Sequence, residues 1–241
     1  MITAGVDLAS QPEHTGSCEL LWAEGRVRVE GLWSRTQDAD LRRLLGSPAQ
    51  KIGFDVPLGW PRAFAELVHR HGRGEQVPQV ETRELTHRAT DRWLGEPGRG
   101  WPLSVSTDRI AYPALRAAPL LQGLPRDGSG VLAEVYPAAA LKAWELPHRG
   151  YKGKGARARR EQILAGLDRA LPGLTRDAQQ GELLLSDDNC LDALVAALVA
   201  RAAACHLCEP IPEQHREDAR IEGWIHVPLP GSLGQLEGTA S

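Results

Sequence analysis

Two short segments of the chain alternate apolar residues with small or acidic ones at the period of a β-strand. In residues 2–9 the apolar side chains alternate with glycine and Asp7, and in residues 51–56 they alternate with glycine and Asp55. Successive strand side chains point to opposite faces, so each aspartate shares its face with a glycine. Pro57 then ends the second segment. The pattern predicts two strands of an α/β sheet, each with a carboxylate near its carboxyl end.

Further acids lie in equally apolar surroundings. Asp188 and Asp192 open the segment 188–207, whose leucine, valine and alanine content predicts a long buried helix. Asp188 can interact with the positive end of that helix, whereas Asp192 lies one turn further in, among apolar residues. Glu134 lies inside a strand expected at 131–136, where acids are disfavoured. Because a buried carboxylate is costly without a cation or metal beside it, these positions indicate chemistry.

The remaining pattern predicts a single α/β domain over residues 1–229. The other expected strands are 18–23, 26–33 and a short last one at 223–228, and the other expected helices are 38–45, 62–71, 81–94, 112–122, 138–144 and 156–170. The helical stretch at about 60–130 is interpreted as an insertion. Residues 230–241 are rich in glycine and serine and are expected to form a flexible tail.

Composition limits where the protein works and what it binds. The net charge is −3, so a nucleic-acid partner would need a local basic patch. Four scattered cysteines do not form a disulfide framework. The chain starts in a strand-like segment without a secretory pattern, and its longest apolar stretch is shorter than a membrane span. We therefore expect a soluble cytoplasmic protein with no membrane association, and the oligomeric state stays open.

The carboxylates are of the type that binds hard divalent cations. Mg²⁺ prefers carboxylate and water oxygens, and two such ions about 3.5–4 Å apart can hold the attacking and leaving oxygens of a phosphodiester. Two strands and one helix could together supply Asp7, Asp55 and Asp192 as metal ligands. The glycines beside the strand aspartates would leave room for an ion or a phosphate. Each acid taken alone is more often a cap or turn residue, and that alternative stays open.

Residues 149–160 form the best candidate for a nucleic-acid contact, because they contain six cations and no acid. Lys152 and Lys154 could bind a substrate phosphate, and Tyr151 could stack on a base. A solvated loop followed by an exposed helix face explains the composition equally well.

A second set of candidates lies in the helix expected at 81–94. Arg88 and Arg92 are four residues apart and could bind phosphate near the acids, and Arg83 is a further candidate. Glu84 and Arg88 are four residues apart and are expected to form an ordinary helical ion pair.

Six segments in order resemble the domain-of-unknown-function family 429: GVDLA (5–9), IGFDVPLG (52–59), TDR (90–92), EVYP (134–137), DNCLDA (188–193) and GWIHVP (223–228). The resemblance covers roughly residues 4–228. Members are described as predicted nucleases with a ribonuclease H-like fold, which implies a mixed five-stranded sheet flanked by helices, with a helical insertion after the fourth strand.

The same resemblance implies roles for single residues. Asp7 would be the first-strand acid of the fold, and Asp55 the acid at the end of the fourth strand, as in Holliday-junction resolvases. Asp192, helped by Asp188, would be the acid of the last long helix. Asp91 and Arg92 match the family motif, which makes them candidate substrate-binding residues.

These observations predict a metal-dependent nuclease that hydrolyses phosphodiester bonds with Mg²⁺ or Mn²⁺. The catalytic candidates are Asp7, Asp55, Glu134, Asp188 and Asp192. One alternative is a nucleotide-binding, ATPase-like protein of the same fold, although no glycine follows Asp7 before Gly16 to form a phosphate turn. The other is a non-catalytic binding protein that retains the acidic cluster.

Overall fold

The computed structural model of the chain describes residues 1–96 and 102–238. Its centre is a mixed six-stranded sheet with the order β5-β4-β1-β2-β3-β6. The strands are β1 (Ile2–Asp7), β2 (Gly16–Ala23), β3 (Arg26–Trp33), β4 (Lys51–Asp55), β5 (Leu132–Glu134) and β6 (Leu174–Thr175). Neighbours are antiparallel from β1 to β3 and parallel elsewhere. The α/β prediction is confirmed.

The number of strands differs from the five that were expected. Strand β6 pairs with β3 through only two residues, which is too short to show a period in the sequence. The strand expected at 223–228 forms only isolated bridges, from Ile225 to Glu134 and from Pro228 to Cys208. Gly223 has a φ of 86°, so the chain turns where that strand was expected to begin.

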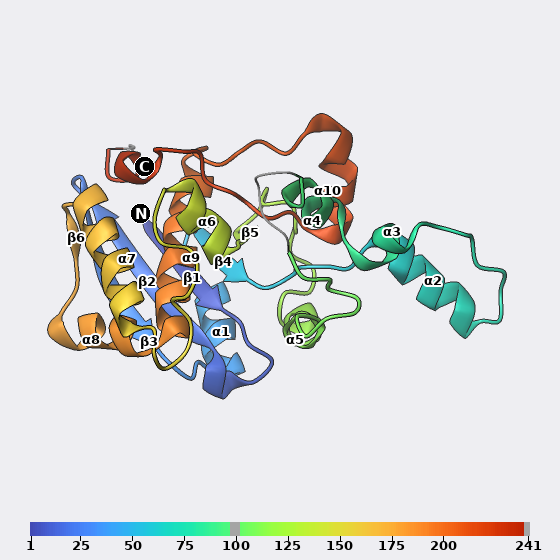
Figure 1. The fold of residues 1–241 in the computed structure, drawn as a ribbon, viewed down its shortest axis with the longest axis horizontal. Helices are drawn as coiled ribbons and strands as arrows, with labels where there is room; N and C mark the ends of the chain where they lie inside the picture. Colours follow the sequence, from blue (N-terminus) through green and yellow to red (C-terminus); the bar gives the residue numbers. More distant parts are fainter. Residues whose placement is uncertain (97–101, 239–241) are drawn as a thin grey trace.

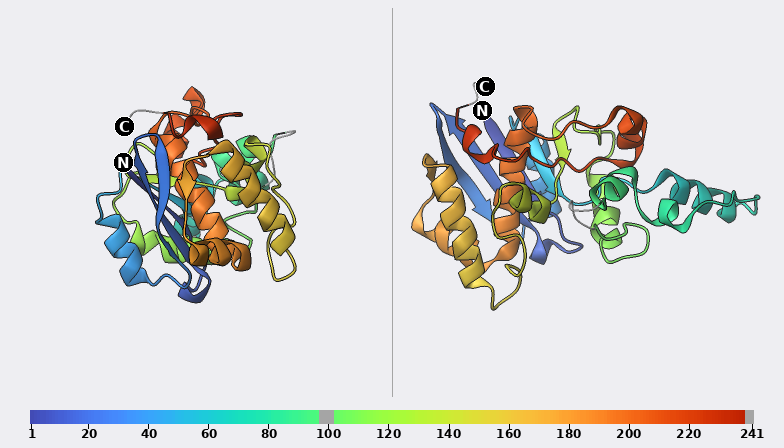
Figure 2. Two further views of the ribbon diagram at one scale, coloured as in Figure 1. Left: turned by 90° about the vertical axis from the view of Figure 1, so that its left-hand side faces the viewer. Right: turned by 45° about the horizontal axis from the view of Figure 1, so that its top comes forward.

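Helices cover both faces of the sheet (Figures 1 and 2). Helix α9 (Asp188–Ala204) crosses one face and packs on β1, β2 and β4. Helices α6 (Pro137–Ala143), α7 (Arg157–Ala170) and α8 (Ala178–Ser186) share the core on this side. Helices α1 (Asp38–Leu45) and α5 (Ala111–Leu120) contribute to a second core on the other face. The large apolar residues of β1 and β4 therefore face the second core, and their glycines face α9, as the alternation predicted.

Helix α9 lies so close to the sheet that only glycine fits beneath it. A Cβ on Gly5 would lie 2.1 Å from the carbonyl oxygen of Ala193, and one on Gly53 would lie 2.3 Å from that of Ala196. The prediction that these glycines leave room for an ion or phosphate is therefore wrong. Their space is filled by the backbone of α9, and this close packing fixes the helix against both aspartate-bearing strands.

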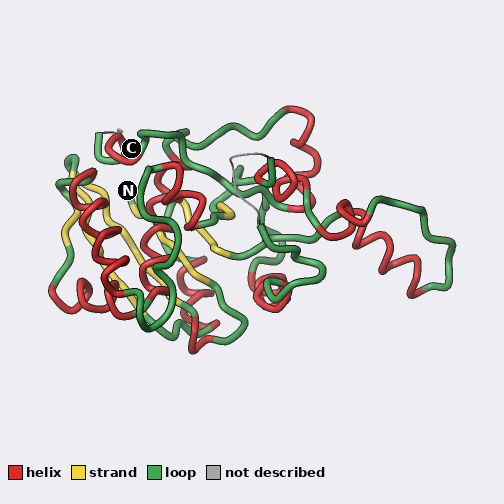
Figure 3. Tube along the Cα trace, viewed as in Figure 1, coloured by secondary structure: helices red, strands yellow, loops and turns green. Residues whose placement is uncertain are grey.

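The connection from β4 to β5 forms the helical insertion. It contains α2 (Arg62–Gly72), α3 (Thr82–Thr86), α4 (Ala89–Leu94) and α5, and its described part has no strand (Figure 3). Helices α2 and α3 extend away from the sheet (Figure 1). The single helix expected at 81–94 is interrupted, because Arg88 caps the start of α4 with extended backbone angles.

The last segment returns from α9 across the insertion and back to the sheet. It contains α10 (Arg216–Glu222) and the short 3-10 helices η2 (Glu213–His215) and η3 (Leu233–Gln235), while η1 (Pro12–His14) joins β1 to β2. The region expected to be a free tail instead buries Leu233 and Leu236 in the main core, and residues 239–241 lie outside the described part. None of the described helices is long and apolar enough to cross a membrane.

Candidate functional site

Asp7 and Asp55 meet at one edge of the sheet. Each is the last residue of its strand, and the two are direct partners in the parallel pairing of β1 with β4. Parallel strands end at the same edge, so this register places two carboxylates side by side. Both side chains alternate away from the α1 face and lie on the side that α9 covers.

Asp192 approaches the same place from α9 and is completely buried. Its Oδ1 accepts a hydrogen bond of 2.8 Å from the hydroxyl of Tyr151, and its Oδ2 lies 2.6 Å from Nζ of Lys152. Tyr151 is itself buried, so it orients Asp192 and is not free to stack on a base as was expected. We call Asp7, Asp55 and Asp192 the acid cluster.

The surroundings of the acid cluster disfavour the charged forms of its carboxyl groups. Burial raises the pKa of Asp7, and the charges of Asp55 and Asp192 raise it further. Burial raises the pKa of Asp55 to about 7, against the opposing charge of Lys152. Burial also raises the pKa of Asp192, again opposed by Lys152. Facing a single ammonium, the three carboxylates therefore favour a proton or a further cation over the free charged forms.

Two acids of the cluster, Asp7 and Asp55, open into a cleft of about 790 Å³, which is in the range of small-molecule and cofactor sites, and Asp192 lies outside its described lining. Asp7, Asp55 and Lys152 line it, and Arg109, Arg149 and Tyr112 lie on its walls. Tyr112 is 69% exposed, and both arginines are exposed as well. The cleft therefore combines acids that can bind a cation with arginines that can bind phosphate.

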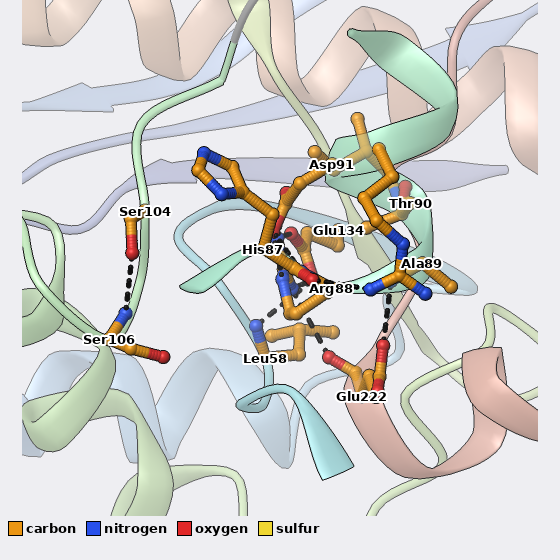
Figure 4. Close-up of polar contacts among 12 residues, drawn as sticks. Leu58, His87, Arg88, Ala89, Thr90, Asp91, Ser104, Ser106, Glu134 and Glu222 are labelled. Atoms are coloured by element: carbon orange, nitrogen blue, oxygen red, sulfur yellow. Dashed lines mark hydrogen bonds and ion pairs between the residues drawn. The ribbon is translucent and has the colours of Figure 1, made fainter. Parts of the chain in front are cut away.

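Glu134, expected among the catalytic acids, is held in a buried ion network beside the cleft (Figure 4). Arg88 donates to both of its carboxylate oxygens, at 2.8 Å and 2.6 Å, and the Leu58 amide donates to Oε2 at 3.0 Å. Arg88 also donates to both oxygens of Asp91, at 3.0 Å and 2.9 Å. Burial raises the pKa of Glu134, while the guanidinium opposes that rise. Glu134 is thus paired with Arg88, and both residues line the cleft.

The same network joins the insertion to the end of α10. Nη1 of Arg88 donates to the Glu222 carbonyl oxygen at 3.2 Å. The Glu222 carboxylate accepts from the amides of Ala89, at 2.7 Å, and Arg62, at 2.8 Å. The ion pair expected between Glu84 and Arg88 is replaced by these contacts, because Arg88 lies at the helix break and turns inward.

A family model described as "Protein of unknown function (DUF429)" matches residues 5–217. The chain belongs to this family. The match includes the whole acid cluster and Arg88, and it ends before residues 223–228, the last segment of the resemblance. No curated protein and no solved structure matches the chain.

The family motif TDR lies next to the cleft but is occupied by structural contacts. Asp91 lines the cleft and is bound by Arg88. Arg92 donates to the His87 carbonyl oxygen at 2.7 Å and is absent from the described cleft lining. Arg83 lies exposed on α3, also outside that lining. The structure therefore does not bring these arginines to the acid cluster.

Asp188 and the basic segment are arranged differently from the expected phosphate patch. Asp188 accepts a hydrogen bond of 3.1 Å from the Gly153 amide and so supports the loop that carries Lys152. Arg160 is buried and donates to the carbonyl oxygens of Tyr151, at 2.7 Å, and Gly153, at 3.0 Å. Lys154 is exposed and lies outside the described cleft lining. Lys152 alone of the two lysines reaches the acid cluster.

The residues of the acid cluster fit a divalent cation in chemistry. All their donor atoms are carboxylate oxygens, which suit Mg²⁺ and Mn²⁺. As the described side chains lie, no three His, Cys, Asp or Glu groups are arranged to hold a metal ion. The cation that the structure places against Asp192 is the ammonium of Lys152, at 2.6 Å from Oδ2.

Two residues that shape the site were expected from the sequence to have other roles. Arg88 was assigned to a surface pair, although its spacing of three residues from Asp91 is that of an N-cap and N3 position. Tyr151 was assigned to substrate, and nothing in the sequence links it to Asp192, which is 41 residues away.

Proposed function

We propose that the protein is a metal-dependent hydrolase that cleaves phosphodiester bonds of nucleic acid, with Mg²⁺ or Mn²⁺ held by Asp7, Asp55 and Asp192. The observation that carries this proposal is the convergence of these three carboxylates, from two paired strand ends and one helix, where Asp7 and Asp55 line a cleft with arginines on its walls. Their mutual repulsion is relieved by a cation.

The sheet supports the finer interpretation of the fold as ribonuclease H-like. Three antiparallel strands are followed by parallel β4 and β5 on the β1 side, and the acids lie on the first strand, the fourth strand and the long helix α9. These are the positions that the family resemblance implies for the catalytic acids. The short β6 is an addition at the far edge.

Different residues of the chain would bind the metal ion, bind the substrate and position the metal ligands. A bound divalent cation would lower the pKa of an attacking water and stabilise charge on the phosphorus centre. Arg109 and Arg149 on the cleft walls can bind phosphate oxygens, and the exposed ring of Tyr112 can stack on a base. Tyr151 holds the Asp192 carboxylate in a fixed orientation.

An ATPase-like activity is less well supported. The first glycine after Asp7 is Gly16, and a Cβ there would lie 2.4 Å from the Asn189 carbonyl oxygen, so this glycine packs against the start of α9. The intervening loop holds η1, which begins with Pro12. A loop of this kind lacks the free glycine amides that cradle a nucleotide phosphate.

The test is cleavage of single-stranded and duplex DNA and RNA in Mg²⁺ or Mn²⁺. We expect Asp7→Asn and Asp192→Asn each to lower the rate at least ~100-fold, because each removes a carboxylate from the acid cluster. Asp168→Asn is the control, since Asp168 pairs with Arg176 on the outside of α7. Full activity of either cluster variant, or no cleavage of any substrate by the native protein, would contradict the proposal.

A further inference from the structure

Lys152 is a cation placed inside a candidate cation site. Its Nζ lies 2.6 Å from Oδ2 of Asp192, while its side chain is 56% exposed and lines the cleft. It therefore lies at the boundary between the buried acids and the space that a substrate would enter.

The backbone on either side of Lys152 is fixed. On one side, Tyr151 is buried and its hydroxyl is bound to Asp192. On the other side, Gly153 is bound to Asp188 through its amide and to Arg160 through its carbonyl. These contacts hold the loop while the four-carbon side chain of Lys152 stays partly in water. The ammonium can therefore change partners by side-chain rotation alone.

The ion pair with Asp192 is easy to exchange for a stronger one. An ammonium supplies one charge and strong hydration, whereas Mg²⁺ and Mn²⁺ supply two charges and prefer carboxylate oxygens. The buried Asp192 carboxylate needs a cation beside it, whereas the half-exposed Lys152 side chain can return to water when another cation takes its place. A divalent cation at the acid cluster would thus displace the ammonium into the cleft.

We propose that Lys152 is an internal counter-ion that competes with the divalent cation for Asp192 and is transferred to a substrate phosphate when the cation binds. The inference rests on the proposed function in taking Mg²⁺ or Mn²⁺ as that cation. Lys152 balances the acid cluster in the free protein and becomes an anion-binding group in the metal-loaded protein. Metal and phosphate would then bind cooperatively through one side chain.

The first experiment is calorimetric titration with Mn²⁺ at constant pH. We expect Lys152→Met to bind Mn²⁺ about tenfold more tightly than the native protein, because the competing charge is gone. Lys152→Arg should stay close to native affinity. Lys154→Met is the matched control, since Lys154 lies exposed two residues along the same loop. Thermal unfolding of each variant checks that it is folded.

The second experiment measures inorganic phosphate binding with and without Mn²⁺. With Mn²⁺ present, Lys152→Met should bind phosphate about fivefold more weakly than the native protein or Lys154→Met. Asp192→Asn should bind phosphate more tightly than the native protein without Mn²⁺, because it frees the ammonium directly. This variant tests the transfer even if Lys152→Met fails to fold.

The outcomes separate the two proposals. Native and Lys152→Met proteins that bind Mn²⁺ equally, or a weaker Lys152→Met, would overturn the counter-ion role and leave the metal site intact. Equal phosphate affinity of the native, Lys152→Met and Asp192→Asn proteins under each condition would overturn the transfer. Absence of Mn²⁺ binding beyond that of an Asp7→Asn, Asp192→Asn double variant would overturn both the counter-ion role and the proposed function.

Discussion

At the scale of single residues, Arg88 shows how one buried cation can hold several polar groups together. Its guanidinium satisfies Asp91, Glu134 and the Glu222 carbonyl oxygen together. The planar guanidinium of arginine has five N–H donors and can bind all three groups, whereas a lysine ammonium could not bind them in the same geometry. The two carboxylates are buried, so each depends on Arg88 for its charge balance.

We expect Arg88→Met to lower the free energy of unfolding by ~3–5 kcal/mol, because it leaves two buried carboxylates unpaired. Urea unfolding measures this loss. Arg70→Met is the control, since Arg70 pairs with Glu66 on the exposed surface of α2, and we expect a loss below ~0.5 kcal/mol. Similar losses for the two variants would mean that the buried network contributes little.

At the scale of secondary structure, the packing of α9 on β1 and β4 sets the geometry of the acid cluster. Asp192 lies on the helix, Asp7 and Asp55 lie on the strands, and Gly5 and Gly53 let the two layers approach. Any side chain between the layers would move the helix and separate the acids.

Gly5→Ala should therefore destabilise the protein by at least ~1–3 kcal/mol and weaken Mn²⁺ binding, because the added methyl meets the backbone of α9 at 2.1 Å. Gly72→Ala is the control: nothing lies within 4 Å of the added carbon, and α2 tolerates alanine. Thermal unfolding and Mn²⁺ titration check both. A Gly5→Ala protein with native stability would show that α9 can shift without loss.

Elements whose own residues carry a clear apolar pattern were predictable, and those defined by tertiary contact were not. Strands β1 and β4 alternate because large apolar side chains occupy one face and glycine and aspartate the other, and α9 is apolar on all sides because it is surrounded. Strand β6 has two residues and no period. The break between α3 and α4 follows from Arg88 turning inward to Glu134, a contact 46 residues away that local pattern cannot reveal.

The candidate site was predictable to about the same extent as the fold. Asp7 and Asp55 were found because strand ends meet at one edge of a sheet, and Asp192 because a carboxylate in an apolar helix is exceptional. Glu134 shares that signal, yet its partner is Arg88, so the signal does not separate a catalytic acid from a salt-bridged one. Lys152 was assigned to phosphate, and its contact with Asp192 depends on the loop conformation.

At the scale of the whole molecule, the acid cluster makes stability depend on pH. A carboxyl whose pKa is raised by folding binds protons in the folded state that the unfolded state has released. The free energy of unfolding therefore falls as pH rises from about 4 to about 7. Burial lowers the pKa of His226, which acts in the opposite direction. Comparing the native protein with an Asp55 variant separates the contribution of the acids to the pH dependence from that of His226.

Without divalent cations, we expect Asp55→Asn to be more stable than the native protein at pH 8 and to lose this advantage by pH 4. A pKa change from 3.8 to about 7 corresponds to at most ~4 kcal/mol at full ionisation. Urea unfolding in a chelator at both pH values measures the difference. His226 contributes equally to both proteins, and Asp168→Asn should show no such advantage. A native protein that is the more stable at pH 8 would contradict the raised pKa of Asp55.

The late position of α9 in the chain also has a kinetic consequence. Strands β1 to β4 end at Asp55, but the helix that covers one face of β1, β2 and β4 begins only at Asp188. During synthesis this sheet face stays open while more than 130 residues are added. Contacts of such long sequence separation form slowly and leave apolar surface exposed meanwhile. Folding should therefore be slow, and a ribosome-bound chain that ends before Asp188 should be a strong chaperone substrate.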